Sequence, residues 1–576
     1  MGDSLSLIFA FLAIITVSRV LKFYSGLTAV SKLPGPRVPF WPYAIPGVLI
    51  PTTWWNPGES YHWINRFSVY KYFGSEVFSI VPFLVGPPGI YISNLDVAHQ
   101  IVGNGRSALT FVKSKSSPYL LEFWRSNIIY SQGDVWRKHR RVLGPAFHNT
   151  LYADVWSRTI QAYHDMVAAE GWHELNVVDI PILAILIIGK CGFGFPFDWT
   201  SQAPHPNGSM SIQESIRVVT SNAALMTSPK WIQKLPFNVF QKVWSARDEL
   251  MQFLKEQVAE RKTALSGFPK ESEERSKDMF SMLVSANEAE SEKLKLSDEE
   301  VVGNIFAMLF AGNETTAYAI AAALGCVSLH QDIQGEALKQ IEEVVGYTRD
   351  PTIDDYPQLS KVLGILFEAL RMFPIGHMIL REAGEDTTLT IPNPTGQPGS
   401  ETISILKGTK IIVDMVGVQY NPRYFDEPEK FKPSRWEGIS ADSETFTAFS
   451  FGPRTCIGRK FAIVEAVCWL TMVLRDWRVE PLMRPEETEE MRSRRALDAR
   501  AGITLNMALL LTRFSLSLFV NCQDDDHADD HQTPVCVGSG TCRTMEALVI
   551  DIQQEVHTSR DAEKTAEVYN TNADAD

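Results

Sequence analysis

A lone cysteine in a tight turn, directly before an apolar helical pattern, constrains this chain more than any other feature. Residues 449–458 read FSFGPRTCIG, which places Cys456 between Gly452 and Gly458, with Arg454 shortly before it. A disulfide needs a second cysteine, and a zinc site needs three further ligands at short spacing. The neighbouring sequence offers neither, so the thiol requires another explanation.

The sequence after the turn supplies one. The spacing of apolar residues over 459–477 predicts a helix, so Cys456 lies at a helix N-terminus, where the macrodipole and free amides favour negative charge. Gly452 and Gly458 lack side chains and let backbone amides approach the sulfur. A thiolate in an apolar turn calls for a metal cation, and a haem iron fits. Arg454 would then pair with a haem carboxylate.

Composition limits the classes of protein to consider. The chain has 576 residues, 45% of them hydrophobic, which is ample for a large buried core. Its net charge is −14, but residues 523–576 hold 13 acidic and 3 basic residues, so −10 lies in this tail and the rest is nearly neutral. A nearly neutral body argues against nucleic-acid binding. The seven cysteines are too irregularly spaced for a disulfide framework, which favours a reducing compartment.

The N-terminal segment has the character of a membrane anchor. Residues 5–17 carry no charge, and the apolar run continues to Leu21 with only Ser18 and Arg19 as interruptions. This length is close to that of a spanning helix, and the basic residues follow it rather than precede it. By the positive-inside rule the chain beyond the anchor stays in the cytosol. The prolines that follow predict a stiff, non-helical hinge.

Helical patterns dominate the body. We expect long helices at 241–262 and 296–325, a core helix at 181–188, and short strands near 77–81, 89–93 and 410–413. Ser297 and Glu300 have the spacing of a capping box at the start of the second long helix. The fold class is therefore mainly α with minor β.

Two further patterns need a functional reason. The helix at 296–325 is interrupted by the polar stretch AGNETT at 311–316. A glycine inside a helix is unfavourable, and a threonine hydroxyl can bond the carbonyl four residues back and bend the helix. Glu368 and Arg371 lie one helical turn apart, so they can form an ion pair on one face.

The turn around Cys456 resembles the haem-binding signature of the cytochrome P450 family, F-x-x-G-x-R-x-C-x-G, at every fixed position. The resemblance covers roughly residues 33–507 and implies the cytochrome P450 fold, a helix-rich haem-thiolate domain with small β-sheets. It also implies haem b as the cofactor, with Cys456 as the axial iron ligand. The other cofactor-binding residues implied by the family pattern are Phe449, Gly452, Arg454 and Gly458.

The resemblance extends to other segments. The stretch from Ala311 to Thr315 matches the oxygen-activating A-G-x-[DE]-T motif, which implies proton delivery by Thr315 and Glu314. The element FKPSRW at 431–436 is similar to the family's F-x-P-x-R-[FW], so Arg435 would complete a structural ion triad with Glu368 and Arg371. A W-x-x-x-R match and the family positions imply that the haem propionates are held by Trp136, Arg140, Arg381 and, by position only, Lys115.

The domain organisation follows from these patterns. We expect a transmembrane signal anchor at 1–24, a proline-rich hinge at 25–51, a cytochrome P450 catalytic domain at 52–515 and an acidic, disordered tail at 516–576. The general character is similar to that of fungal microsomal members. This similarity implies a single-pass protein of the endoplasmic reticulum membrane with a cytosolic catalytic domain.

The resemblance implies a monooxygenase that oxidises a lipophilic small molecule, such as a terpenoid or another secondary metabolite, with O2. No dinucleotide-binding pattern follows residue 480, so electrons would come from NADPH through a separate cytochrome P450 reductase, with cytochrome b5 as an additional donor. An isomerase or dehydratase of the same fold stays open, although such members tend to lose the pair kept here as Glu314 and Thr315. A non-catalytic haem protein for sensing or electron transfer is the alternative from another class.

Overall fold

The computed structural model describes the main part of the chain. The described residues are 2–58, 60–103, 110–113, 126–170, 174–175, 180–195, 197, 210–222, 238–267, 278–291, 293–440, 443–481, 488, 499–500, 504–505 and 509–513. All of them belong to one compact unit, Met1–Phe514. The acidic tail expected at 516–576 lies outside the described residues.

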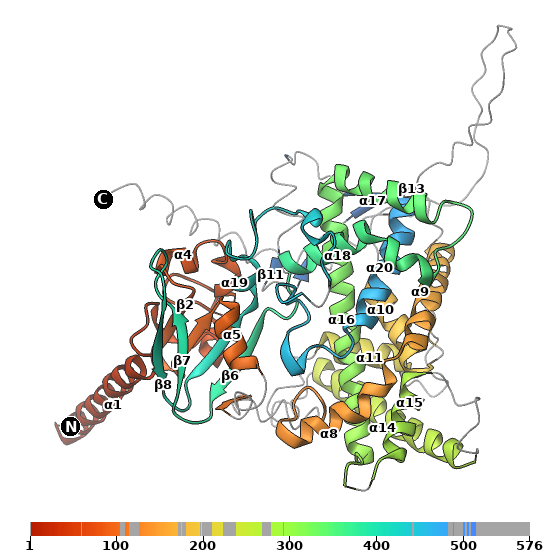
Figure 1. Cartoon of the computed structure of the whole chain (residues 1–576). Helices are drawn as coiled ribbons and strands as arrows, with labels where there is room; N and C mark the ends of the chain where they lie inside the picture. The colour runs from red at the N-terminus through yellow and green to blue at the C-terminus, as the bar shows by residue number, and fades with distance from the viewer. Residues whose placement is uncertain are drawn as a thin grey trace, which may run out of the picture. The chain divides into compact units, whose positions relative to one another are not determined.

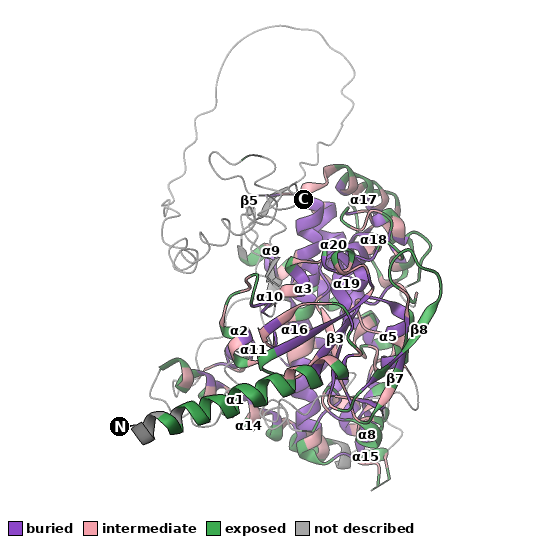
Figure 2. Ribbon diagram, turned by 90° about the vertical axis from the view of Figure 1, so that its left-hand side faces the viewer, coloured by how far each residue is buried: buried purple, intermediate pink, exposed green. Residues whose placement is uncertain are grey.

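A long buried helix, α16 (Asp298–Leu329), runs through the helical part of the unit (Figures 1 and 2). The helices packed against it include α10 (Ile180–Ile187), α14 (Asn238–Gly267), α18 (Ser360–Met372) and α20 (Arg459–Asp476). Further helices surround these: α8 (Gly133–Leu143), α9 (Asn149–Glu170), α11 (Ile212–Ser221), α15 (Met279–Ala289) and α17 (Gln331–Val344). The expected helices at 181–188, 241–262, 296–325 and 459–477 are thus confirmed, with shifted ends.

The capping box of α16 is present. The Ser297 hydroxyl accepts the Glu300 amide at 3.2 Å, and the Glu300 carboxylate accepts the Ser297 amide at 3.0 Å. These bonds satisfy amides that would otherwise lack partners in the first helical turn. The start of the central helix is therefore fixed by its own sequence.

The strands form small sheets beside the helices. The largest has the order β1-β2-β3-β9-β6-β4, and its strands are Arg37–Phe40, Val77–Val85, Gly89–Ile92, Lys410–Asp414, Met378–Ala383 and Phe111–Val112. In a second sheet, β13 (Leu509–Arg513) pairs with both β10 (Trp477–Pro481) and β5 (Glu174–Leu175). Two hairpins, β7–β8 (Thr387–Pro392 with Ser400–Ile405) and β11–β12 (Ala499–Arg500 with Thr504–Leu505), complete them. The fold class, mainly α with minor β, is as predicted.

Helix α1 (Gly2–Ala29) is exposed over most of its length, as Figure 2 shows, and its exposed residues include Leu7, Phe9, Phe11 and Ile14. By length and composition, Phe9–Ala29 suffices to cross a membrane. Its last turns differ, because Phe23 and Leu27 pack against the core of the large sheet. This packing explains why the helix runs past residue 24, where the expected anchor ended.

The segment after α1 was predicted to be non-helical throughout, and that prediction was wrong in one place. Ile45–Leu49 forms the short helix α2, with Pro46 in its first turn. Proline is tolerated there because the first amides of a helix lack partners in any case. The other short helices are α3 (Tyr61–Ile64), α4 (Val69–Phe73), α5 (Leu95–Val102) and α19 (Met415–Gln419).

Glu368 of α18 is a buried hub that joins distant segments. Glu368 and Arg371 have no exposed side-chain surface, and the Arg371 Nε lies 2.8 Å from the carboxylate. Arg435 donates to the same carboxylate at 2.9 Å, as does the Trp436 indole, and the Lys432 amide donates at 3.0 Å. The expected ion triad of Glu368, Arg371 and Arg435 is therefore assembled.

Aromatic packing connects this hub to the cysteine turn. The Phe367 ring lies 4.0 Å from that of Phe446 and packs on Trp436, and Phe446 in turn lies 6.0 Å from Phe449. Aromatic contacts of this kind add stabilisation beyond the buried area. The position of the turn thus depends on residues nearly ninety positions before it.

We expect Glu368→Gln to destabilise the protein by about 3 kcal/mol, because it leaves the buried Arg371 guanidinium without a compensating charge. Urea unfolding followed by tryptophan fluorescence measures the change. The matched control is Glu336→Gln, which breaks a surface pair with Lys361 and should cost less than about 1 kcal/mol. Equal effects of the two substitutions would contradict a special role for the hub.

Candidate active site

The turn around Cys456 is held by its own backbone. The Cys456 amide donates to the Phe449 carbonyl at 3.0 Å, and the Thr455 hydroxyl donates to the Gly452 carbonyl at 2.7 Å. Gly452 has a φ of 72°, and a Cβ there would lie 3.0 Å from the Val102 carbonyl oxygen. Both the backbone conformation and the space therefore require glycine at this position.

The Cys456 side chain is accessible, although the surrounding protein partly desolvates it. This desolvation raises the pKa of the thiol, while the Gly458 amide, Arg140 and Arg459 act in the opposite direction. A Cβ at Gly458 would make only ordinary contact with Phe147, so space alone does not require glycine at this position.

Three cationic side chains converge beside this turn. Lys113, Arg381 and Arg454 line a cavity of about 150 Å³, together with Trp136 and Gln132. Within the described part of the chain, no carboxylate forms an ion pair with any of the three. Burial, together with Arg454 and Arg381, lowers the pKa of Lys113 to about 7. Burial also lowers the pKa of Arg381 and of Arg454 to about 10 in each case, and Arg381 contributes to the shift at Arg454.

Helix α8 brings its two predicted residues to the same place. The Arg454 guanidinium stacks 4.6 Å over the Trp136 ring and donates to the Ser131 carbonyl at 2.9 Å. Arg140, one helical turn after Trp136, donates to the Thr455 carbonyl at 3.3 Å. Trp136, Arg140, Arg381 and Arg454 are thus gathered around the cysteine turn from three separate segments.

The polar stretch of α16 stays helical. The Thr315 hydroxyl donates to the Ala311 carbonyl at 2.5 Å, the local bond that the sequence suggested. Thr315 is exposed although most of the helix is buried, so this side of α16 borders open space. A Cβ on Gly312 would lie 2.1 Å from Ile188 Cδ1, so a larger residue there would require the Ile188 side chain to move. Burial raises the pKa of Glu314.

Sequence reasoning missed Lys113 and named Lys115 in its place. Lys115 lies outside the described residues. Lys113 directly follows β4, whose pairing with β6 brings it near Arg381. No motif marks this lysine, because its position depends on a pairing between strands far apart in the sequence.

Comparison with known proteins agrees with this geometry. The sequence profile of the cytochrome P450 family matches residues 50–507. The chain is 32% identical to cytochrome P450 monooxygenase 124 of Postia placenta, over 88% of this chain and 98% of the relative. It is 26% identical to cytochrome P450 monooxygenase prx9 of Penicillium rubens, over 68% of this chain and 73% of that protein.

Solved structures show the same fold. The cytochrome P450DA heme domain superposes with a TM-score of 0.63 at 18% identity, covering 84% of this chain and 98% of that structure. A zebra fish cytochrome P450 with progesterone gives a TM-score of 0.61 at 19% identity, over 78% of this chain and 99% of that one. The family match, the fungal relatives and the shared fold together show that the chain belongs to the cytochrome P450 family of monooxygenases.

Proposed function

We propose that this chain is a membrane-anchored haem-thiolate monooxygenase that inserts one oxygen atom from O2 into a lipophilic small molecule. The observation that carries the proposal is the pairing of an accessible thiol with three cations that line a cavity beside its turn and lack carboxylate partners among the described residues. A bound group that carries both an iron and carboxylates would give the thiol a metal to bind and the three cations their anionic partners.

The residues fit haem b. Cys456 would be the axial ligand, and the propionates would be held by Lys113, Arg381 and Arg454 with Trp136 beside them. Arg140 would act from the thiolate side, where it already interacts with Cys456. When bound, the haem supplies the chemistry of O2 reduction, and the thiolate ligand favours O–O cleavage. Phe449, Gly452 and Gly458 would shape the turn around the sulfur.

Thr315 and Glu314 would move protons. The Thr315 hydroxyl is exposed on the open side of α16. It donates its single hydrogen to the Ala311 carbonyl, so it would have to turn away from that carbonyl to offer a proton on the open side. Glu314 lies one residue before it, and its raised pKa increases the share of the protonated acid near neutral pH. Together they would supply protons to bound O2.

The substrate is proposed to be a lipophilic compound such as a terpenoid or another secondary metabolite. By family position, substrate contacts would come from residues 107–132, 218–240 and 374–379. Of the apolar residues there, Ile375 and Met378, after α18, are partly buried, and the others, Tyr119, Leu120, Phe123, Trp124, Met226 and Trp231, lie outside the described residues. A relative with 26% identity over 70% of this chain is named cyclooctat-9-en-7-ol 5-monooxygenase, of Streptomyces melanosporofaciens, which supports a similar substrate class.

Electrons would come from NADPH through a cytochrome P450 reductase, with cytochrome b5 as an additional donor, at the endoplasmic reticulum membrane where α1 would be the single anchor. Arg141 is well exposed, although it also pairs with Glu290, and Arg459 and Lys460 lie beside the cysteine turn. Exposed cations on the thiolate side would attract an acidic donor. Lys138 is less available because it pairs with Glu300.

The test is turnover of the full-length chain in microsomes with NADPH, the reductase and ¹⁸O2, over a panel of terpenoids and other lipophilic compounds. A monooxygenase yields product that carries the heavy isotope and consumes NADPH. An isomerase or dehydratase would give product without label or NADPH demand. A sensor or electron-transfer protein would give no product, and either result would reject the proposal.

We expect Thr315→Ala to lower the yield of product per NADPH by about tenfold, with hydrogen peroxide released instead, because the positioned proton donor is lost. Parallel measurement of NADPH, peroxide and product gives this ratio. The control is Thr316→Val, which conserves shape at the buried neighbour and should keep the ratio near that of the wild type. An unchanged ratio for Thr315→Ala would count against the proton-delivery role.

A further inference from the structure

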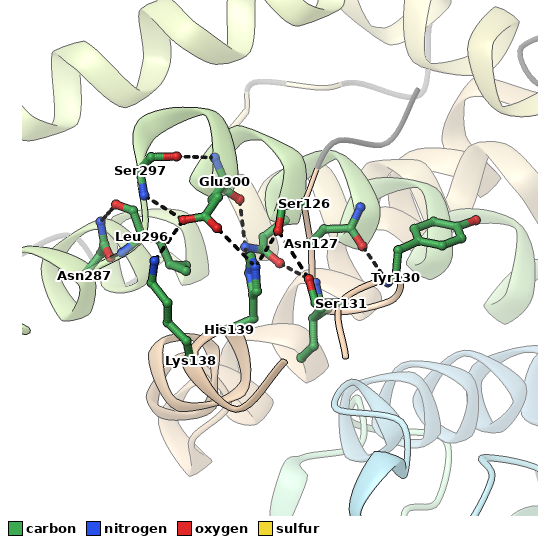
Figure 3. Close-up of polar contacts among 12 residues, drawn as sticks. Ser126, Asn127, Tyr130, Ser131, Lys138, His139, Asn287, Leu296, Ser297 and Glu300 are labelled. Carbon is green, nitrogen blue, oxygen red and sulfur yellow. Dashed lines mark hydrogen bonds and ion pairs between the residues drawn. The ribbon is translucent and has the colours of Figure 1, made fainter. Parts of the chain in front are cut away.

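A polar network joins α8 to the first turns of α16, as Figure 3 shows. Its centre is His139, which has no exposed surface and lies between Trp136 and Arg140 on α8. Across from it stands Asn304, also fully buried, on α16. A buried polar pair of this kind must be satisfied internally, so its partners are informative.

The contacts of Asn304 fix the proton positions. Its Oδ1 accepts the Ile128 amide at 2.8 Å, so its Nδ2 must be the group facing the Glu300 carbonyl and the His139 Nδ1, each at 2.7 Å. A carbonyl oxygen only accepts, and Nδ2 carries two hydrogens. His139 Nδ1 is therefore an acceptor, and the imidazole is the neutral form protonated at Nε2. Burial lowers the pKa of His139, which agrees with this form.

The other side of the ring has polar partners too. His139 Nε2 lies 3.2 Å from the Ser126 hydroxyl and 3.7 Å from the Glu300 carboxylate. Glu300 also closes the capping box of α16 and accepts Lys138 of α8 at 3.1 Å. Burial alone would raise the pKa of Glu300, but the Ser297 amide and Lys138 lower it overall. The two helices are thus joined through both His139 and Lys138.

The network reaches the candidate haem partners. Ser126 contacts the Ser131 hydroxyl at 3.3 Å, and the Ser131 carbonyl accepts Arg454. Asn304 precedes Thr315 by eleven residues, about 16 Å along the same helix. One set of hydrogen bonds therefore connects the segment with Trp136 and Arg140, the loop that holds Arg454, and the helix with Thr315.

We propose that His139 and Asn304 are positioning residues that fix α8 relative to α16, and thereby hold the propionate-binding side chains at the haem. This inference rests on the proposed function, because it assumes that haem occupies the site. Neither residue would touch the haem itself. Their role is to set the distance between the helix that carries Trp136 and Arg140 and the helix above the haem.

Substitutions of His139 can separate positioning from general stability. In His139→Asn, the side-chain Oδ1 stands as many bonds from the backbone as Nδ1 and can accept from Asn304. In His139→Gln, the side-chain amide instead replaces Nε2, and in His139→Phe both contacts are lost while the ring volume stays. Helix propensity ranks Gln above Asn, and Gln is also closer to His in size. If general stability alone decided haem retention, His139→Gln would therefore retain haem better than His139→Asn. The hydrogen bond to Asn304 predicts the opposite order.

The experiment measures the rate of haem loss from the purified holoprotein to an excess of apomyoglobin, together with the Soret band of the ferrous CO complex. We expect His139→Asn to lose haem at a rate within about threefold of the wild type, and His139→Gln and His139→Phe about tenfold faster, because each leaves the Asn304 donor unpaired. The two faster variants should also show a smaller share of the red-shifted, thiolate-ligated CO band.

Two comparisons complete the design. Val135→Ala, at an exposed position of the same helix, should leave both measurements unchanged. Asn304→Leu should lose haem at least as fast as His139→Phe, because it also leaves the Ile128 amide unpaired. The double variant should lose haem no faster than about twice the rate of Asn304→Leu alone, since both substitutions remove one shared contact. Additive effects would contradict the direct coupling.

The outcomes separate the two proposals. A wild-type protein that takes up no haem would reject the proposed function. If the wild type binds haem, either of two results would overturn the positioning role alone. In the first, His139→Gln loses haem no faster than His139→Asn; in the second, all His139 variants lose haem at the rate of the wild type.

Discussion

The buried carboxylate of Glu368 is the interaction on which the rest of the site depends. It accepts from Arg371 on its own helix and from Arg435 and Trp436 far along the chain. Such a charge is stable in the core only because every oxygen has donors, and removal of one partner leaves the other uncompensated. The aromatic contacts from Trp436 through Phe446 to Phe449 then carry this fixed position to the cysteine turn. The position of the Cys456 thiol therefore depends on the ion triad and on the aromatic residues that connect it to the turn.

The site combines this rigid support with an electrostatic imbalance. Besides burial, Arg454 and Arg381 lower the pKa of Lys113, and Arg381 lowers the pKa of Arg454. Within the described residues no carboxylate forms an ion pair with any of the three. Like charges held together in a partly buried place are unfavourable in isolation. Binding of a dianionic ligand would relieve this cost. On this account, a bound haem would complete the site electrostatically.

Local sequence patterns predicted much of this arrangement. The Ser297–Glu300 capping box and the Glu368–Arg371 pair depend on residues within one helical turn, so their spacing alone was sufficient. The turn around Cys456 was recognisable because Gly452, Arg454 and the cysteine are close together in sequence. The reason for Gly452 was less evident, since its positive φ and its contact with Val102 appear only in the folded chain.

Features set by long-range contacts were not predictable. Lys113 joins Arg381 through the pairing of β4 with β6, and no local pattern reveals it. The extension of α1 to Ala29 depends on packing of Phe23 and Leu27 on a sheet formed much later in the chain. The pairs of Lys138 with Glu300 and of Arg141 with Glu290 join segments far apart in the chain, so no local pattern reveals them. The role of His139 also needs α16 beside it.

The central claim is that the sulfur of Cys456 binds the haem iron as a thiolate. Its most direct test is the spectrum of the ferrous CO complex of the purified protein, with Cys456→Ala as the comparison. The wild type should show the red-shifted Soret band of a thiolate ligand, and the variant should lack it, with haem lost or otherwise ligated. A variant that keeps both its haem and the red-shifted band would contradict the account.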